Sequence, residues 1–145
     1  MDTKLSDITK EELEGAKSST HGPATITITR NGTPELIETQ AYGAGSWGGF
    51  SKSYDNGDFL AARIDYGSDL PSGTYIREFP LLFAYLTDKD GSRYGPGHLK
   101  AGKVTVKVEL NGPNFKYDVS VENVTYEFNG KTVAVDGNFS VATGD

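Results

Sequence analysis

The residues whose types could do chemistry gather in one short stretch around the only tryptophan. Between Ala41 and Tyr54 the sequence reads AYGAGSWGGFSKSY, with four glycines and the aromatic residues Tyr42, Trp47 and Phe50 beside the final tyrosine. Glycine lets a backbone approach a ligand closely, and an aromatic ring can stack on a sugar ring or on a partner's side chain. The stretch therefore predicts a recognition site. The alternative is that Trp47 packs into the core and that the glycines serve turns and bulges.

A second stretch of interest runs from Arg93 to His98 and reads RYGPGH. Tyr94 could stack on a ligand, the arginine could bind an anion, and His98 could supply a titratable side chain. Loops often carry binding sites, so this stretch is a secondary candidate. The alternative is a stiff connection with incidental polar residues. The two stretches form one site only if the fold brings them to the same end of the domain.

Catalytic machinery is hard to assemble from this sequence. There is no cysteine, which excludes a disulfide framework, a catalytic thiol and a cysteine zinc site, and the only histidines are His21 and His98. No nucleophile elbow, zinc signature or phosphate-binding glycine loop is present. We therefore predict no catalytic residue and no cofactor, with a glycosidase-like carboxylate pair left open. The carboxylates near the glycine-rich stretch are Asp55, Asp58, Asp65 and Glu78.

The spacing of one acidic run argues against a calcium loop. The run DKDGS, from Asp88 to Ser92, resembles the first positions of an EF-hand loop. The twelfth position of such a loop supplies a bidentate carboxylate, and here that position is Leu99. We therefore predict no metal site and interpret Asp90-Gly91 as part of a turn.

Length and charge exclude several classes of partner. The chain has 145 residues, with 14 basic and 20 acidic side chains and a net charge of −6. An acidic surface repels phosphate backbones, and no basic stripe concentrates the positive charges, so we expect no nucleic-acid partner. No apolar run approaches the roughly 20 residues that span a bilayer. The start, MDTK, lacks the pattern of a signal peptide, so a leader, if there was one, is absent from this sequence.

The first 23 residues differ in pattern from the rest. Residues 6–16 predict a short helix, because serine or threonine can cap it, glutamates suit its first turn, and its few apolar residues can form a narrow stripe. Residues 17–23 contain serine, glycine and proline and predict a linker. A chain of this length commonly forms one domain that needs no covalent staples. We therefore expect a helix and linker over 1–23 and a single β domain over 24–145.

From Ala24 onward the apolar period changes to two, which indicates strands. Ile26 and Ile28 alternate with threonines up to Arg30, and the following Asn31-Gly32 is a strong hairpin signal. Turn residues separate the later runs. The expected strands after the first hairpin are 35–42, 58–66, 74–79, 81–87, 104–110, 115–128 and a last one after Gly130. The run 81–87 is almost wholly apolar and is expected to be buried.

The last two strands contain a slip in their alternation. Apolar residues stand at odd positions up to Val121 and at even positions from Val124. With a two-residue turn at Asn129-Gly130, an uninterrupted ladder would put Phe139 on the wrong face. One extra residue near Glu122-Asn123 restores the register, so we predict a β-bulge there. The predicted pairs are Phe128–Lys131, Tyr126–Val133, Val124–Val135, Val121–Gly137 and Val119–Phe139.

These patterns define a fold class. Short strands with turn signals every 8–12 residues or so are typical of sandwiches and barrels. No tandem repeat is evident. We predict an all-β protein, an antiparallel β-sandwich or small β-barrel of about eight to ten strands, with a short N-terminal helix.

The second half resembles a group of bacterial domains in the order of its motifs. These are DLPSGTY at 69–75, AGKVTV at 101–106, FKYDV at 115–119, and Lys131 with GNF at 137–139. The order is similar to that of small β-sandwich domains of secreted or lipid-anchored proteins in Bacteroidetes-type bacteria, over about residues 59–141. The resemblance implies a surface or periplasmic setting, a leader removed from this chain, and residues 2–23 as a tether. It implies no reaction and no ligand.

We therefore predict a non-enzymatic binding module of a bacterial envelope or secreted protein, recognising a glycan or a protein. The expected contacts are Trp47, Tyr42, Phe50 and Tyr54, with Tyr94 and His98 as secondary ones. One alternative is a small barrel that holds an apolar small molecule, with cyclase or isomerase activity. Aromatic residues of the run 81–85 could line its cavity. Another is a structural or assembly protein whose exposed strand edge pairs with a second chain. The oligomeric state is left open.

Overall fold

The computed structural model describes residues 20–44, 46–68, 70–112 and 114–143. The helix expected over 6–16 lies outside the described residues. These residues form ten strands and one short 3-10 turn, which confirms the all-β prediction. The elements are β1 (Thr20–Arg30), β2 (Thr33–Ala44), β3 (Trp47–Ser53), β4 (Phe59–Asp65), β5 (Gly73–Glu78), β6 (Phe83–Thr87), β7 (Arg93–Tyr94), η1 (Pro96–His98), β8 (Leu99–Asn111), β9 (Asn114–Phe128) and β10 (Lys131–Thr143).

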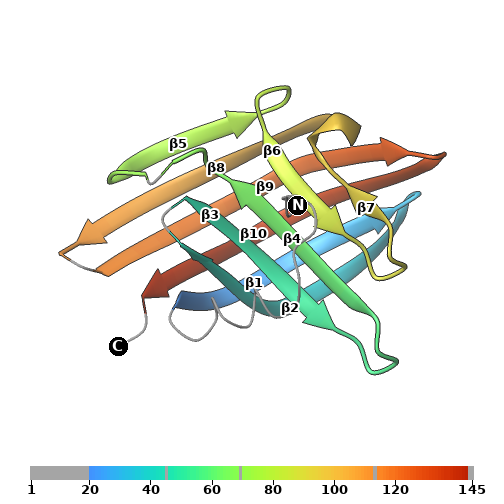
Figure 1. Ribbon diagram of the computed structural model, residues 1–145, viewed down its shortest axis with the longest axis horizontal. Coiled ribbons are helices and arrows are strands. Elements are labelled where there is room, and N and C mark those ends of the chain that lie inside the picture. The colour runs from blue at the N-terminus through green and yellow to red at the C-terminus, as the bar shows by residue number, and fades with distance from the viewer. Residues whose placement is uncertain (1–19, 45, 69, 113, 144–145) are drawn as a thin grey trace, which may run out of the picture.

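All ten strands belong to one antiparallel sheet. Their order is β5-β8-β9-β10-β1-β2-β3-β4-β6-β7. Figure 1 shows the sheet curled over itself, with β3, β4 and β6 crossing in front of β8, β9 and β10. β5 is at one end of the order and β6 lies next to the other end, yet only residues 79–82 separate them. Because so short a link spans at most about 18 Å, the curl brings the two ends of the sheet together. The fold is a curled half-barrel.

Local register was predictable from the turns. Asn31 and Gly32 have φ values of 48° and 88°, as a two-residue hairpin turn requires. On β9 and β10 the five predicted pairs are all present, and Glu122 and Asn123 together face Asp136 at the predicted bulge. Asn123 has a φ of 50°, and its N–H donates to Asp136 Oδ1 at 2.8 Å. The bulge prediction is confirmed.

β1 begins at Thr20, four residues before its expected start, so part of the presumed linker is strand. The β1–β2 ladder runs through Gly22 and Pro23, whereas the β1–β10 ladder is interrupted at both. Proline has no N–H to give to that second ladder. A Cβ on Gly22 would lie 2.1 Å from the Ser140 carbonyl oxygen, so glycine permits the close approach of β10. Turn-forming residues are therefore accommodated inside this strand.

The core lies on the inner face of the curled sheet. Ile26, Ile28 and Val104 are fully buried there. The expectation that 81–87 is buried throughout is wrong, because β6 alternates: Leu86 is fully buried, whereas Phe83 is 51% exposed. No second layer of described residues lies over the outer face of β6, so its outward apolar side chains meet solvent.

The void between the strands of the core is small. The void between β3, β4, β6, β9 and β10 has a volume of about 20 Å³ and is lined by apolar side chains that include Phe50, Ile64 and Tyr126. A space of this size holds about one water molecule. An apolar small molecule would find no room in this void.

Candidate functional site

Three short strands place a grid of side chains on the outer face of the sheet. The register aligns Trp47 with Asp65 and Asp65 with Phe83. The neighbouring row on the same face aligns Gly49, Arg63 and Tyr85. Because side chains alternate across a strand, both rows point away from the core.

Asp65 lies at the centre of this grid, and only one of its two carboxylate oxygens has a hydrogen-bond partner among the described residues. Arg63 donates from Nε to Asp65 Oδ1 at 2.8 Å, and its guanidinium lies 4.6 Å from the centre of the Trp47 ring. The side chains of Arg63 and Asp65 are 20% and 16% exposed. Asp65 Oδ2 is buried and has no hydrogen-bond partner among the described residues. A buried acceptor without a partner is rare and costs free energy, which calls for an explanation.

A surface hollow opens beside Asp65. It has a volume of about 380 Å³, and we call it the aromatic hollow; its lining residues are Ser46, Asp65, Gly67, Phe83 and Tyr85. Burial raises the pKa of Tyr85, and the nearby Asp65 carboxylate raises it further. The phenol is therefore a neutral hydrogen-bonding group at neutral pH. The hollow combines aromatic surface, a carboxylate and hydroxyl groups.

A second hollow adjoins the first and shares Phe83 and Gly67 with it. It has a volume of about 530 Å³ and lies where the two ends of the sheet meet. We call it the apolar hollow; it is lined by Tyr66, Gly67, Ile76, Arg77, Glu78, Phe79, Pro80, Leu81 and Phe83. Arg77 donates to the carbonyl oxygens of Ile76 and Tyr66 at 3.3 and 3.1 Å, so it holds the segment after β4 against β5.

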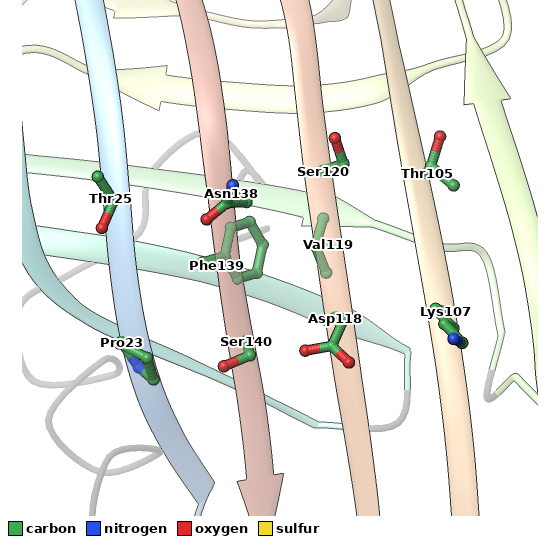
Figure 2. Close-up of a pocket in the computed structure, with 10 residues that line it drawn as sticks. All are labelled: Pro23, Thr25, Thr105, Lys107, Asp118, Val119, Ser120, Asn138, Phe139 and Ser140. Carbon is green, nitrogen blue, oxygen red and sulfur yellow. The ribbon is translucent and has the colours of Figure 1, made fainter.

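The long strands carry a different hollow, which we call the polar groove. It has a volume of about 370 Å³ on the outer face of β1, β10, β9 and β8. Figure 2 shows two rows of side chains across these strands, Thr25, Asn138, Ser120 and Thr105 in one row and Pro23, Ser140, Asp118 and Lys107 in the other. Every polar side chain in the groove is at least partly open to solvent. Val119 and Phe139, also in its lining, are buried in the core.

The aromatic stretch around Trp47 does not converge on one point. Tyr42 is buried on the outer face, packed with Ala61 and with the half-buried Trp47 and Phe59. Phe50 points the other way into the core, 6.1 Å from the Phe139 ring centre. Trp47 is therefore the aromatic residue of this stretch that lies beside Asp65 in the grid.

Tyr54 belongs to a polar cluster that joins two parts of the sheet. Its hydroxyl donates to Glu35 Oε2 at 2.9 Å, and burial and this acceptor raise its pKa to about 12. Arg30 donates a hydrogen bond to Glu35 at 2.6 Å and two hydrogen bonds to Asp88, each of 2.8 Å. The Asp88 side chain is only 3% exposed. These contacts give Tyr54 a structural partner and fix the turn after β6 to β1 and β2.

The second predicted stretch also divides between core and surface. Tyr94 is 1% exposed and packs against Tyr126, with ring centres 5.5 Å apart. His98 is half-buried, accepts the Gly95 N–H at Nδ1 over 3.2 Å, and lies 4.3 Å from the Phe128 ring. His98 and Trp47 share none of the three hollows, so the described geometry does not bring the two stretches together.

Sequence reasoning missed most of the residues around the aromatic hollow. Phe83 and Tyr85 stand in a run read as buried, and Asp65 was one of four carboxylates with no preference among them. A usable signal was present: Phe83, Tyr85 and Thr87 alternate with smaller or aliphatic residues on β6, which is the pattern of a two-faced strand.

The described part of the chain holds no group of three histidine, cysteine or acidic side chains placed to bind a metal ion. Within it, no helix has the length and apolar character needed to cross a membrane.

Comparison of the chain with protein-family models, with curated proteins and with solved structures finds no match. The interpretation of the site therefore depends on its own residues.

Proposed function

We propose that this protein is a non-enzymatic binding module that recognises a carbohydrate in the aromatic hollow. The observation that carries the proposal is Asp65 Oδ2, a buried carboxylate oxygen that has no partner among the described residues and is set between Trp47 and Phe83 in the register. A ligand that donates a hydrogen bond to this oxygen would remove the cost of leaving it unpaired.

The charge around Asp65 favours a neutral donor over a cation. Arg63 already neutralises the carboxylate through Oδ1 and already occupies the face of the Trp47 ring. A second cation would therefore be repelled by the nearby guanidinium, because the carboxylate is already paired. A hydroxyl group can use the remaining oxygen without that repulsion.

Sugars match the other walls of the hollow. The exposed Phe83 ring and the half-buried Tyr85 ring offer apolar faces for the C–H side of a sugar ring, while Ser46 and Tyr85 offer hydroxyls. The volume of about 380 Å³ lies within the roughly 300–1,000 Å³ of ligand pockets. Because Oδ2 is buried, a ligand reaches it only when a neighbouring group moves, and changes of side-chain rotamer are common on binding.

A protein ligand is the second candidate, favoured by the exposed apolar side chains next to Phe83. The interior void offers no comparable space for an apolar small molecule. A setting at the cell envelope stays a proposal that rests on the sequence resemblance.

The test is a titration of Trp47 fluorescence with a panel of soluble oligosaccharides. The expected result is a saturable change for at least one glycan, weakened roughly 3- to 10-fold by Phe83→Ala, because the ring face is lost. Leu36→Ala is the matched control, since Leu36 is exposed on β2 and lines none of the three hollows. Binding that Phe83→Ala and Tyr85→Ala leave unchanged would reject this hollow, and the absence of any binding glycan would reject the ligand class.

A further inference from the structure

The strongest unexplained surface outside the aromatic hollow is the apolar hollow. Among the described residues, seven large apolar side chains are exposed, and four of them line this hollow. They are Ile76 at 53%, Phe79 at 40%, Leu81 at 74% and Phe83 at 51%. At about 150–250 Å² for a large side chain, their exposed parts amount to roughly 400 Å². A contiguous patch of this size on a single chain is often functional.

The hollow borders an open strand edge. β5 pairs with β8 along one side from Gly73 to Glu78 and, among the described residues, with no strand along the other. Unpaired N–H and C=O groups of an edge strand are a template for an added strand. Apolar side chains beside an open edge are the elements of recognition by strand addition, in which the backbone gives affinity and a pocket gives specificity.

We propose that the apolar hollow and the open edge of β5 bind an extended segment of a partner protein. The segment adds as a strand to β5 and inserts an apolar side chain between Ile76 and Leu81. This interaction surface is separate from carbohydrate binding, although the two hollows share Phe83.

The available area favours a short segment over a second copy of the chain. Two patches of roughly 400 Å² fall well short of the roughly 1,200–2,000 Å² of total surface that stable complexes bury. A peptide that gains hydrogen bonds along a six-residue edge does not need that area.

The outer face of β5 specifies the chemistry of the segment. Ile76 and Glu78 project on the same face, one step of the alternation apart, opposite Thr105 and Lys103 of β8. The side chains of a strand added to the open edge alternate between the two faces of the sheet in register with those of β5. The segment therefore carries an apolar residue and, two positions away, a basic one that meets Glu78. The net charge of −6 also attracts a basic partner.

The first experiment selects binders from a random dodecapeptide library displayed on phage, using the whole protein as bait. Enriched peptides are resynthesised and their affinity is measured by fluorescence polarisation. Expected are sequences with the apolar-x-basic pattern and affinities at least about tenfold weaker for Leu81→Lys and Ile76→Lys. Leu36→Lys, a charge change at an exposed leucine that lines none of the three hollows, is the matched control and keeps the affinity. Melting curves of all three variants establish that they are folded.

The second measurement tests strand pairing itself. N-methylation of the best peptide at one residue at a time removes single N–H donors. Strand addition predicts that binding is lost at every second position, because alternate N–H groups face β5.

The proposal would be overturned by a selection without any enriched sequence, by peptides that bind Leu81→Lys as well as the wild type, or by uniform tolerance of N-methylation. Sedimentation showing a dimer that Leu81→Lys dissociates would make a second copy the occupant and would equally overturn it. Asp65→Asn separates the two proposals, since it should weaken glycan binding and leave peptide binding intact.

Discussion

The polar groove and the aromatic hollow are nearly equal in volume, about 370 and 380 Å³, and lie on the outer face of the same sheet. They differ in whether their polar atoms have hydrogen-bond partners. The hydroxyls of Thr25 and Ser120 in the groove are open to water, which satisfies them at little cost. Asp65 Oδ2 in the hollow is buried without a described partner. A buried polar atom without a described partner therefore distinguishes the candidate site from ordinary sheet surface, whereas volume does not.

The largest expected effect concerns the ion pair between Arg30 of β1 and Asp88 in the turn after β6. Arg30→Met removes both bonds to Asp88, whose side chain is 3% exposed, and leaves a buried charge without its main partner. We expect the free energy of unfolding to fall by about 3 kcal/mol. Urea denaturation measures this.

The matched change at the aromatic hollow is Arg63→Met, where the partner Asp65 is more exposed and the expected loss is about 1 kcal/mol. Equal losses for the two variants would show that burial does not distinguish these ion pairs.

The next prediction is that a substitution of Asp65 changes glycan binding more than stability. In Asp65→Asn the buried charge is removed, so the free energy of unfolding should stay within about 1 kcal/mol of wild type or rise. Glycan affinity should fall at least about tenfold, because a hydrogen bond to a charged acceptor is worth roughly 1.5–3 kcal/mol. Calorimetry and urea denaturation measure the two quantities. A large loss of stability with unchanged binding would make Asp65 a structural residue.

Substitutions in the polar groove should have almost no effect on stability or on glycan binding. Ser120→Ala and Thr105→Ala remove solvated hydroxyls from its floor, so each should change the free energy of unfolding by less than about 0.5 kcal/mol. Glycan affinity should not change. A groove variant that abolishes binding in the fluorescence titration would move the site to the long strands.

The smallest effect is a pH dependence at an exposed ion pair. Lys131 and the Ser92 backbone N–H lower the pKa of Asp90 to about 2 from an ordinary value of 3.8. Because the folded-state pKa is the lower one, this stabilisation is present above about pH 4 and is lost as pH falls towards 2. Both side chains are nearly half exposed, so solvent screens the effect. Melting temperatures of Asp90→Asn and wild type should converge slightly between pH 4 and pH 2.

Features set by neighbouring residues were predictable from the sequence. The turn at Asn129-Gly130 and the parity slip before it fixed the β9–β10 register, including the bulge, because a hairpin pairs residues that are close in the chain. The first hairpin followed from Asn31-Gly32 for the same reason.

Features set by distant pairing were not predictable. β5 stands between β4 and β6 in the chain but pairs with β8, which leaves β4 and β6 as neighbours. This exchange aligns Asp65 with Phe83 and Arg63 with Tyr85. Hydrophobicity alone suggested that Phe83 was core, since nothing local shows that one face of β6 is uncovered. The aromatic hollow is therefore a product of topology, whereas the aromatic stretch around Trp47 could be recognised from composition.

The most direct test of carbohydrate recognition in the aromatic hollow is calorimetry of one binding glycan against wild type, Asp65→Asn and Ser120→Ala under identical conditions. If the glycan binds at Asp65, Asp65→Asn binds it at least about tenfold more weakly and Ser120→Ala binds it like the wild type. Undiminished binding by Asp65→Asn, with loss in Ser120→Ala, would contradict it and assign the ligand to the polar groove.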